Sequence, residues 1–329
     1  MSIIVRVRIL LAVVSLCCGF QAHGGNLLYA DHPLAGKIWD LSRRSYLDEA
    51  ALLENIETAD VLLIGEVHDN PQHHDIERRL LKARIKSAPA LMMEQLNADD
   101  QAALDLSLSS SDRDDVLRRV YRLIRFSNAQ DYQPLLAIAV NNNLPIIAAN
   151  VTNQHLLPVI WRGFEAYDAG ELKRLAVEQV WNEERQRYLL ANMGGAHCGQ
   201  LKDELRAGLT RSQRMRDALM ADSAVASIAR GVIAIVGSSH ARRDIGLPLY
   251  LAARAPTARI VSIGMVEVSP SRNDPIAYVS TATGEAPYDV IWFTPRVERA
   301  DPCADLVMPK MAEPPAGKPK AKPARSRDY

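Results

Sequence analysis

The stretch Val61-Leu-Leu-Ile-Gly-Glu-Val-His-Asp-Asn-Pro71 contains an apolar run that meets a glycine, followed by a carboxylate and an imidazole. A short apolar run bounded by turn residues is typical of a strand that is covered on both faces. We expect Gly65 to let the backbone change direction without a side-chain penalty. Glu66 and His68 lie two positions apart, so their side chains point the same way if the chain stays extended.

The same stretch continues into a predicted helix. Asn70 is a favourable N-cap residue, Pro71 suits the first turn, and residues 72–87 are compatible with a helix. Because His73 and His74 are adjacent on this helix, we expect at most one of them to face inward. The predicted unit is a strand, a polar turn and a helix, and ligands of open α/β sheets bind beyond the carboxyl ends of the strands.

Similar apolar runs recur along the chain and indicate about six strands. Most of them are separated by segments with helical spacing, which predicts an α/β fold with a mostly parallel central sheet and helices on both faces. Residues 37–41 are expected to form a short edge strand, and residues 151–230 a helical insertion. The further apolar runs are residues 88–93, 144–149, 231–236, 259–268 and 288–293.

The two ends of the chain differ from the α/β domain predicted for residues 25–308. Residues 1–24 have the basic start, the short apolar stretch and the small residues of a secretory signal peptide. A lipid anchor on Cys17 or Cys18 is the alternative, although neither cysteine follows the small residue expected before an acceptor. Residues 309–329, rich in proline and basic residues, predict a disordered tail. We therefore expect an exported protein of the periplasm or cell envelope.

Charge and cysteine content exclude further classes. The formal net charge is zero and the basic residues of the two ends leave the body acidic, so no nucleic-acid partner is expected. Only Cys198 and Cys303 remain after removal of the signal peptide. The sequence is compatible with one disulfide between them and does not establish it.

Polar side chains follow several of the predicted strands, namely Glu66 with His68, Glu94, Asn150 and His240. Each alone has an ordinary structural explanation, such as a core histidine or a carboxylate that caps a strand. Adjacent parallel strands would bring them into one crevice, and buried polar groups need partners, so together they favour a functional cleft. The strand order that this requires does not follow from the sequence.

These residue types suit two kinds of chemistry. Glu66, His68, Glu94 and His240 can bind zinc, manganese or iron with an open position that activates water. They can also form an acid and base pair without a metal. The sequence has no His-Glu-x-x-His, Cys-x-x-Cys, nucleotide-binding glycine loop or Gly-x-Ser-x-Gly, which argues against the enzyme classes that use those motifs.

Several motifs occur in order along roughly residues 36–296. They are Gly65-Glu-Val-His-Asp-Asn-Pro-Gln-His-His74, Met93-Glu-Gln95, Tyr132-Gln-Pro-Leu135, Ala148-Ala-Asn150, Gln213-Arg-Met-Arg-Asp-Ala-Leu-Met-Ala221, Gly237-Ser-Ser-His240 with Gly246-Leu-Pro248, and Tyr288-Asp-Val-Ile-Trp-Phe293. Together they resemble the ChaN family of haem-binding, iron-regulated proteins, which is grouped with Tiki-type proteases and erythromycin-esterase-like proteins. The Tiki relatives also use two Gly-x-x-His motifs, which correspond here to residues 65–68 and 237–240.

The resemblance implies an α/β core with helical additions, export to the cell envelope, often as a lipoprotein, and haem binding for iron uptake. It implies a haem held by tyrosine, a ligand suited to ferric iron. Tyr188 in the helical insertion is a candidate, although it can equally be a packing residue, and His197 and Met193 near it are alternatives. Asn150 would lie at the sheet edge beside the haem, which binds within one chain or across a homodimer.

The leading hypothesis is therefore an exported haem-binding protein linked to iron acquisition, with an envelope or outer-membrane haem receptor as partner. The alternative is a metal-dependent hydrolase, a peptidase or esterase, that uses the two Gly-x-x-His motifs. Haem is the cofactor of the first hypothesis and a divalent metal ion that of the second.

Overall fold

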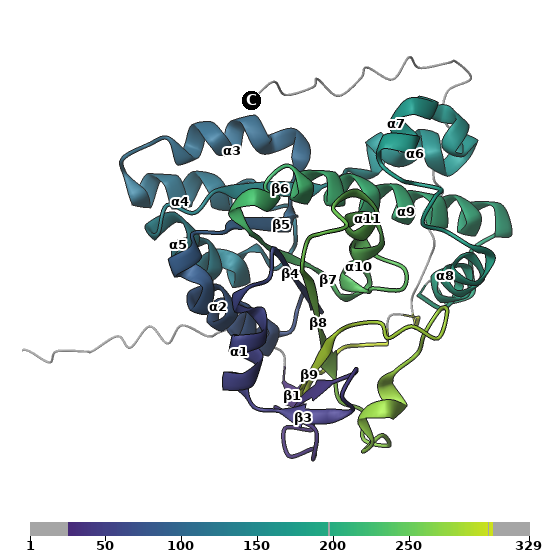
Figure 1. Cartoon of the computed structure of the whole chain (residues 1–329), viewed down its shortest axis with the longest axis horizontal. Coiled ribbons are helices and arrows are strands. Elements are labelled where there is room, and N and C mark those ends of the chain that lie inside the picture. The colour runs from purple at the N-terminus through teal and green to yellow at the C-terminus, as the bar shows by residue number, and fades with distance from the viewer. Residues whose placement is uncertain (1–25, 197, 302, 305–329) are drawn as a thin grey trace, which may run out of the picture.

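A central sheet of eight strands organises the computed structural model of this chain, which describes residues 26–196, 198–301 and 303–304 (Figure 1). The parallel strands are β4 (Val61–Glu66), β5 (Ala90–Asn97), β6 (Ile146–Asn150), β7 (Val232–Gly237), β8 (Ile260–Glu267) and β9 (Val290–Thr294). Two antiparallel strands, β2 (Ile38–Asp40) and β3 (Ser45–Leu47), extend one side. The order across the sheet is β3-β2-β9-β8-β4-β7-β5-β6. A separate small sheet pairs β1 (Leu27–Leu28) with β10 (Arg296–Val297).

The predicted fold class is confirmed, and two details of the sheet are corrected. The six predicted strands are the six parallel ones, and β2 with β3 brings the total to eight. Residues 37–41 do not form an edge strand, because β2 lies between β3 and β9. A tight reversal after Asp40 lets residues 45–47 fold back and cover the outer side of β2.

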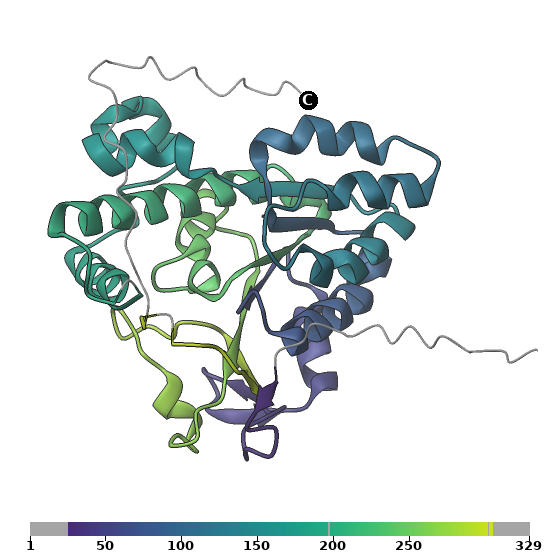
Figure 2. The ribbon, with the colours of Figure 1, turned by 180° about the vertical axis from the view of Figure 1, so that it is seen from behind.

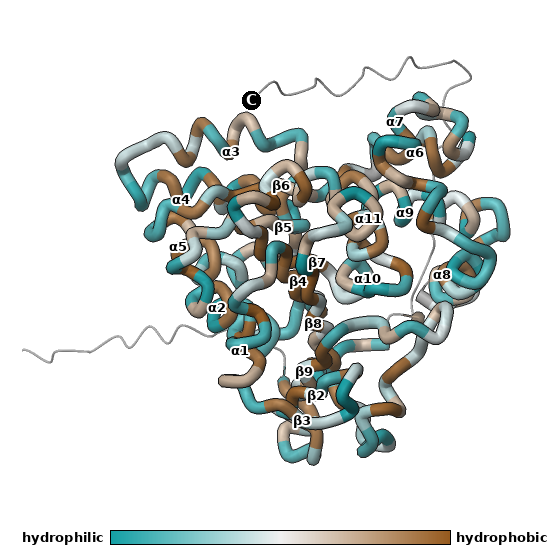
Figure 3. The backbone as a smooth tube through the Cα atoms, viewed as in Figure 1, coloured by the Kyte–Doolittle hydropathy of each residue, from teal (hydrophilic) through white to brown (hydrophobic). Residues whose placement is uncertain are grey.

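Helices cover both faces of the sheet (Figures 1 and 2). Leu62 and Ile64 of β4 enter the core on one face, and Val61 and Leu63 enter the core on the other, as the alternation of strand side chains requires. Figure 3 shows the central strands as predominantly hydrophobic segments. The first face carries α1 (Glu49–Glu57), α2 (Pro71–Arg84), α3 (Gln101–Leu108), α4 (Arg113–Tyr121) and α5 (Gln133–Asn141). Residues 153–254 contribute α6 (Asn153–Arg162), α7 (Ala169–Arg174), α8 (Glu183–Ala196), α9 (Asp203–Val225), α10 (Ser238–Ala241) and α11 (Leu247–Arg254).

The start of α2 follows the sequence prediction. The Asn70 side chain accepts a hydrogen bond from the backbone N–H of Gln72, and Pro71 is the first helical residue. The α-helix ends at Arg84, three residues earlier than expected, and a 3-10 turn covers Ile85–Ser87. Ala88 then takes a left-handed conformation, with φ of 47°, which ends the helical segment.

Both histidines of α2 are buried, so the expectation that one at most would face inward is wrong. They have separate inward partners. Nε2 of His73 lies 2.8 Å from the hydroxyl of Thr294 on β9, whereas Nε2 of His74 lies 3.1 Å from the carbonyl oxygen of His68. The first turn of α2 is enclosed between the sheet edge and the loop after β4, so two adjacent positions can both be inward.

Gly65 lies inside β4 and does not turn the chain, contrary to expectation. A β-carbon at this position would lie 2.8 Å from the β-carbon of Ala241 and 3.0 Å from the α-carbon of Ser238. Glycine is required because α10 passes directly over the strand. This close approach places the second Gly-x-x-His motif against the first.

Three sequence predictions concern the ends of the chain and its cysteines. Residues 1–24 and 309–329, predicted as signal peptide and tail, lie outside the described residues. Within the described part, no helix has both the length and the apolar character of a membrane span. Cys198 and Cys303 form a disulfide with their α-carbons 5.7 Å apart, which resolves the pairing that the sequence left open.

Candidate functional site

The strand order brings three of the predicted site residues to one end of the sheet. β4, which ends in Glu66, lies beside β7, which leads into α10 with His240. β5, which carries Glu94, lies on the other side of β7. All three side chains are buried, so their convergence forms a polar centre at the carboxyl end of the parallel strands.

Glu66 is held by one of its carboxylate oxygens. Oε1 accepts hydrogen bonds from Tyr132 Oη at 2.7 Å and Gln95 Nε2 at 2.5 Å, and Nδ1 of His68 lies 2.8 Å away. The expected common direction of Glu66 and His68 is therefore confirmed. Burial and the nearby charge of Glu77 raise the pKa of Glu66 to about 8.

His240 lies between two buried acids. Its Nδ1 is 2.5 Å from Oδ1 of Asp217 on α9, and its Nε2 is 3.4 Å from Oε1 of Glu94. The second oxygen of Glu94 accepts the backbone N–H of Gly237 at 2.6 Å. Two negative neighbours therefore hold the imidazole in its charged form.

The pKa values of these groups follow from burial and mutual charge. Burial alone would lower the pKa of His240, but the charges of Glu94 and Asp217 raise it to about 10. Burial alone would raise the pKa of Glu94, but the charge of His240 lowers it to about 2. Burial raises the pKa of Asp217 to about 6 despite the favourable charge of His240. The centre thus holds a protonated imidazole next to an ionised carboxylate at neutral pH.

His68 connects this arrangement to the surface. A β-carbon built on Gly237 would lie 3.2 Å from His68 Nε2 and 3.5 Å from Glu94 Oε2, so both groups converge on that glycine. The His68 side chain is 36% exposed, whereas those of Glu66 and His240 are buried. Burial lowers the pKa of His68, but the hydrogen bond to Glu66 and that carboxylate's charge raise it above the ordinary value. A cavity of about 440 Å³ adjoins it, lined by Val67, His68, Asp69, Phe126, Ser127 and Asn128.

A second group of metal-binding residue types lies behind Glu66. It consists of Glu66 itself with His74 and Glu77. The ligand atoms of these three residues all lie within 4.8 Å of one another. Of the four predicted metal ligands, only Glu66 belongs to it. His68, Glu94 and His240 stay a prediction as ligands.

Sequence reasoning missed Tyr132, Asp217 and Glu77 as site residues. Asp217 and Glu77 each interrupt the buried face of a helix, and a charged residue on an apolar face is the signal that could have found them. Burial raises the pKa of Glu77 to about 7.

The predicted haem ligands lie outside the polar centre. Tyr188 and Met193 are half-buried on α8, and His197 lies outside the described residues. The Tyr188 hydroxyl donates to the Ser280 carbonyl and contacts its hydroxyl, both at 3.3 Å, and the Arg242 guanidinium lies 4.9 Å from the ring centroid. Ligation by these residues stays a prediction.

Asn150 is also separate from the acids and histidines. It ends β6, at the edge of the sheet, and its amide donates to the side-chain oxygen of Asn97 at 3.2 Å. β5 lies between β6 and the strand that leads to His240. A role beside a haem therefore stays a prediction for Asn150.

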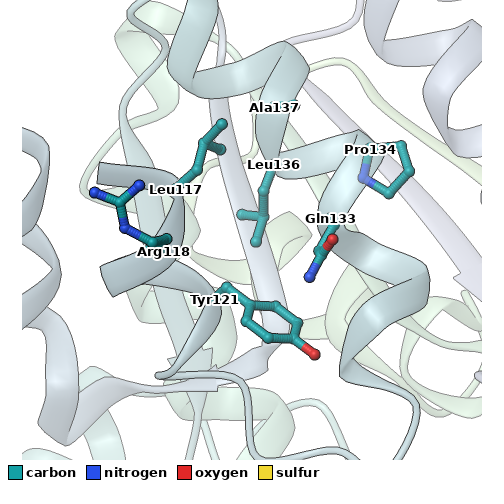
Figure 4. A pocket seen from close by; sticks show the side chains of 7 residues that line it. All are labelled: Leu117, Arg118, Tyr121, Gln133, Pro134, Leu136 and Ala137. Carbon is teal, nitrogen blue, oxygen red and sulfur yellow. The ribbon is translucent and has the colours of Figure 1, made fainter. Parts of the chain in front are cut away.

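An apolar groove lies on the outer side of α4 and α5 (Figure 4). Its volume is about 400 Å³, and Figure 4 shows the Tyr121 ring at its side. Leu117 and Tyr121 are four residues apart, next to the buried Val116 and Val120, so they form a half-exposed stripe along α4. That second stripe is the signal that sequence reasoning missed. The lining residues are Leu117, Arg118, Tyr121, Gln133, Pro134, Leu136 and Ala137.

Comparisons with known proteins agree with this fold. A family model described as haem-binding uptake, Tiki superfamily, ChaN matches residues 52–251. ChaN of Campylobacter jejuni, in a structure described as cofacial heme binding, superposes with a TM-score of 0.62 at 18% identity, covering 78% of this chain and 95% of that chain. A mutant of the erythromycin esterase EreC in its open conformation reaches a TM-score of 0.40 at 12% identity, with the same coverage. No curated protein matches the chain.

The matched residues span more than half of the chain and run from α1 to α11, so they include both Gly-x-x-His motifs and all the acids of the polar centre. The similarity to the Campylobacter jejuni structure independently shows the same fold. On this evidence the chain belongs to the ChaN family of the Tiki superfamily, the family described as haem-binding uptake proteins.

Proposed function

We propose that this protein binds ferric haem in the groove between α4 and α5, with the Tyr121 phenolate as iron ligand, and that it serves haem uptake. The family description and the cofacial heme of the Campylobacter jejuni protein support haem as the ligand. The observation that carries the location is a tyrosine beside an apolar wall with an arginine next to it. Tyr121 replaces Tyr188 as the favoured ligand because the Tyr188 hydroxyl already contacts Ser280.

The groove fits the chemistry of haem in three ways. Leu117, Pro134 and Ala137 offer apolar surface to a porphyrin face. A phenolate oxygen is an established protein ligand of ferric haem. The Arg118 guanidinium suits a propionate carboxylate, because its planar fork matches a carboxylate in two hydrogen bonds.

The size of the groove bears on the assembly. About 400 Å³ of open groove can accept one face of a porphyrin and leaves the other face uncovered. A second copy of the chain with its own haem would cover that face, so we propose a homodimer with cofacial haems. An envelope haem receptor would then accept the cargo.

Export to the periplasm or cell envelope is part of the proposal, and the pairing of Cys198 with Cys303 supports it. Structural disulfides persist in oxidising compartments and are rare in the cytosol. Whether the chain carries a lipid depends on residues 1–24, outside the described part of the chain.

Titration with hemin tests the haem site. We expect a saturable ferric Soret shift at about one equivalent per chain, and we expect Tyr121→Phe to weaken binding at least tenfold, roughly 1.4 kcal/mol. Tyr188→Phe is the matched control, because it removes the same hydroxyl from α8 and should leave the affinity unchanged. The reverse result would move the haem to Tyr188, and the lack of a saturable shift in the native chain would overturn the proposal.

A second candidate function is hydrolysis, which the exposure of His68 beside a cavity favours. His68 can accept a proton from water at Nε2 while Glu66 holds its Nδ1. The charged His240 nearby can stabilise a developing anion. The geometry that supports this role is a base at the surface, backed by a buried carboxylate.

Screens with peptide and ester libraries, with and without added Mn²⁺ or Zn²⁺, test the hydrolase. If the chain hydrolyses a substrate, Glu66→Gln should lower kcat at least about 100-fold, because His68 loses the carboxylate that orients it. Hemin affinity should stay nearly unchanged in the same variant, since Glu66 is not among the residues that line the groove. No turnover under any metal condition would argue against this function.

A further inference from the structure

Glu66 belongs to a buried cluster of acids and a histidine whose composition neither haem binding nor hydrolysis by His68 explains. It consists of Glu66 at the end of β4 and of His74 and Glu77 one turn apart on α2. Both carboxylates are fully buried, with exposures of 1% and 0%. The ion-pair partners of Glu66 are His68 and His74, and that of Glu77 is His74.

The two oxygens of Glu66 have different surroundings. Oε1 has three partners, from His68, Gln95 and Tyr132. Oε2 has no hydrogen-bond partner, although it is buried and lies 3.5 Å from Nδ1 of His74. A buried carboxylate oxygen without a donor is unfavourable, so Oε2 is directed at a position where a positive group is needed.

His74 is oriented as a ligand at the same position. Its Nε2 lies 3.1 Å from the carbonyl oxygen of His68, which can only accept, so Nε2 carries a hydrogen. In the neutral imidazole, Nδ1 is then the nitrogen with the free lone pair. A ring nitrogen that donates to a backbone carbonyl while the other faces outward is the usual arrangement of metal-binding histidines.

The lone pair of His74 therefore meets further electron-pair donors instead of a proton donor. Nδ1 lies 3.3 Å from Oε2 of Glu77 and 3.5 Å from Oε2 of Glu66. The other oxygen of Glu77, Oε1, is buried and has no hydrogen-bond partner. Three electron-pair donors from two buried carboxyl groups and one imidazole converge, an arrangement that a cation would stabilise.

We propose that Glu66, His74 and Glu77 bind one divalent transition-metal cation. One imidazole nitrogen and two carboxylate oxygens suit Mn²⁺, Fe²⁺, Co²⁺ or Zn²⁺ and do not favour a soft cation, because the set contains no sulfur ligand. The ion would join α2 to the end of β4 and keep Glu66 Oε1 turned toward His68. This site differs from the set Glu66, His68, Glu94 and His240 that the sequence suggested, and it is independent of haem.

Cobalt loading of the full-length protein tests the site. The chain is stripped with a chelator and then loaded with Co²⁺ both by titration and by refolding in its presence. We expect one Co²⁺ per chain by elemental analysis, a visible d–d absorption spectrum, and a rise in Tm with Co²⁺ concentration. Glu77→Gln should weaken Co²⁺ binding at least tenfold and remove the rise in Tm. The apo form of this variant should still fold, because the substitution keeps the shape of the side chain and removes one of two buried carboxyl groups that lie close together.

Controls separate this proposal from the others. Asp75→Asn removes an exposed carboxylate from the same helix and should leave Co²⁺ binding unchanged. Tyr121→Phe should also leave it unchanged, and Glu77→Gln should not alter hemin affinity, so failure of one proposal does not imply failure of the other. Co²⁺ binding that is lost in Glu94→Gln but kept in Glu77→Gln would overturn the assignment. The same conclusion follows if neither loading method gives stoichiometric Co²⁺, because a proton then occupies the cluster instead of a metal.

Discussion

Replacement of His240 with alanine should lower the free energy of unfolding by about 3–5 kcal/mol near pH 7, the typical loss when one partner of a buried ion pair is removed. His240 is the cation between Glu94 and Asp217, which are 7% and 1% exposed. Without it, the two buried carboxylates lose their direct ion-pair partner and keep only the influence of Arg216 and His68 nearby. Urea unfolding followed by circular dichroism measures the loss.

The pH dependence of this loss follows from the pKa of His240, which is about 10 in the folded chain and 6.5 ordinarily. The native state therefore keeps a proton that the unfolded chain releases. This contribution to stability is complete below about pH 6.5 and is lost as the pH rises to about 10, with a slope of at most about 1.4 kcal/mol per pH unit. The difference between native chain and His240→Ala should shrink over that range.

His155→Ala is the matched control for the histidine substitution. His155 also pairs with an acid, Asp99, but its side chain is 57% exposed. Exposed ion pairs contribute about 1 kcal/mol or less, so this variant should unfold almost like the native chain at every pH. A loss below about 1 kcal/mol for His240→Ala would show that the buried pairing has little energetic effect.

The second large effect is expected for Gly208→Ala in α9, with a loss of about 3 kcal/mol, the upper end of the overpacking range. A β-carbon at Gly208 would overlap the backbone carbonyl oxygen of Ile160 and lie 2.9 Å from its Cγ2. The guanidinium of Arg211 also donates to the Ile160 carbonyl at 2.9 Å. The alanine would therefore push α6 away from α9 and break the contacts that end α6.

Gly195→Ala gives the opposite expectation at a helical glycine. Gly195 is exposed on α8, and nothing lies within 4 Å of a β-carbon there. Alanine is favoured over glycine inside a helix by about 1 kcal/mol, so this variant should unfold at slightly higher urea. Equal midpoints for the two variants would mean that the helices of residues 153–225 are not packed as the structure shows.

The proposed haem groove and the polar centre use different but adjoining parts of the chain. Gln133 and Leu136 of α5 line the groove, while Tyr132, immediately before α5, donates to Glu66. A shift of Gln133 in the groove can therefore move Tyr132 and its hydrogen bond to Glu66. The hemin titrations of the Glu66→Gln variant measure this coupling directly.

Much of the site was predictable from short patterns. The strand of residues 61–66, the cap of α2 by Asn70 and the common direction of Glu66 and His68 depend on neighbours in the sequence, and the structure confirms them. The role of Gly65 could not be predicted from the sequence, because the atom that excludes a β-carbon there belongs to Ala241, far along the chain. Both His73 and His74 are buried for a similar reason, since their partners lie on other elements.

The sequence by itself determined the α/β class, the parallel strands and the family, because apolar periodicity, caps and motif order are local properties of the chain. The tertiary structure decided which polar groups meet. The strand order placed β7 between β4 and β5, and the course of α9 delivered Asp217 to His240. These contacts join residues 23 or more positions apart, and their energies depend on distance and burial in space, which no local pattern records.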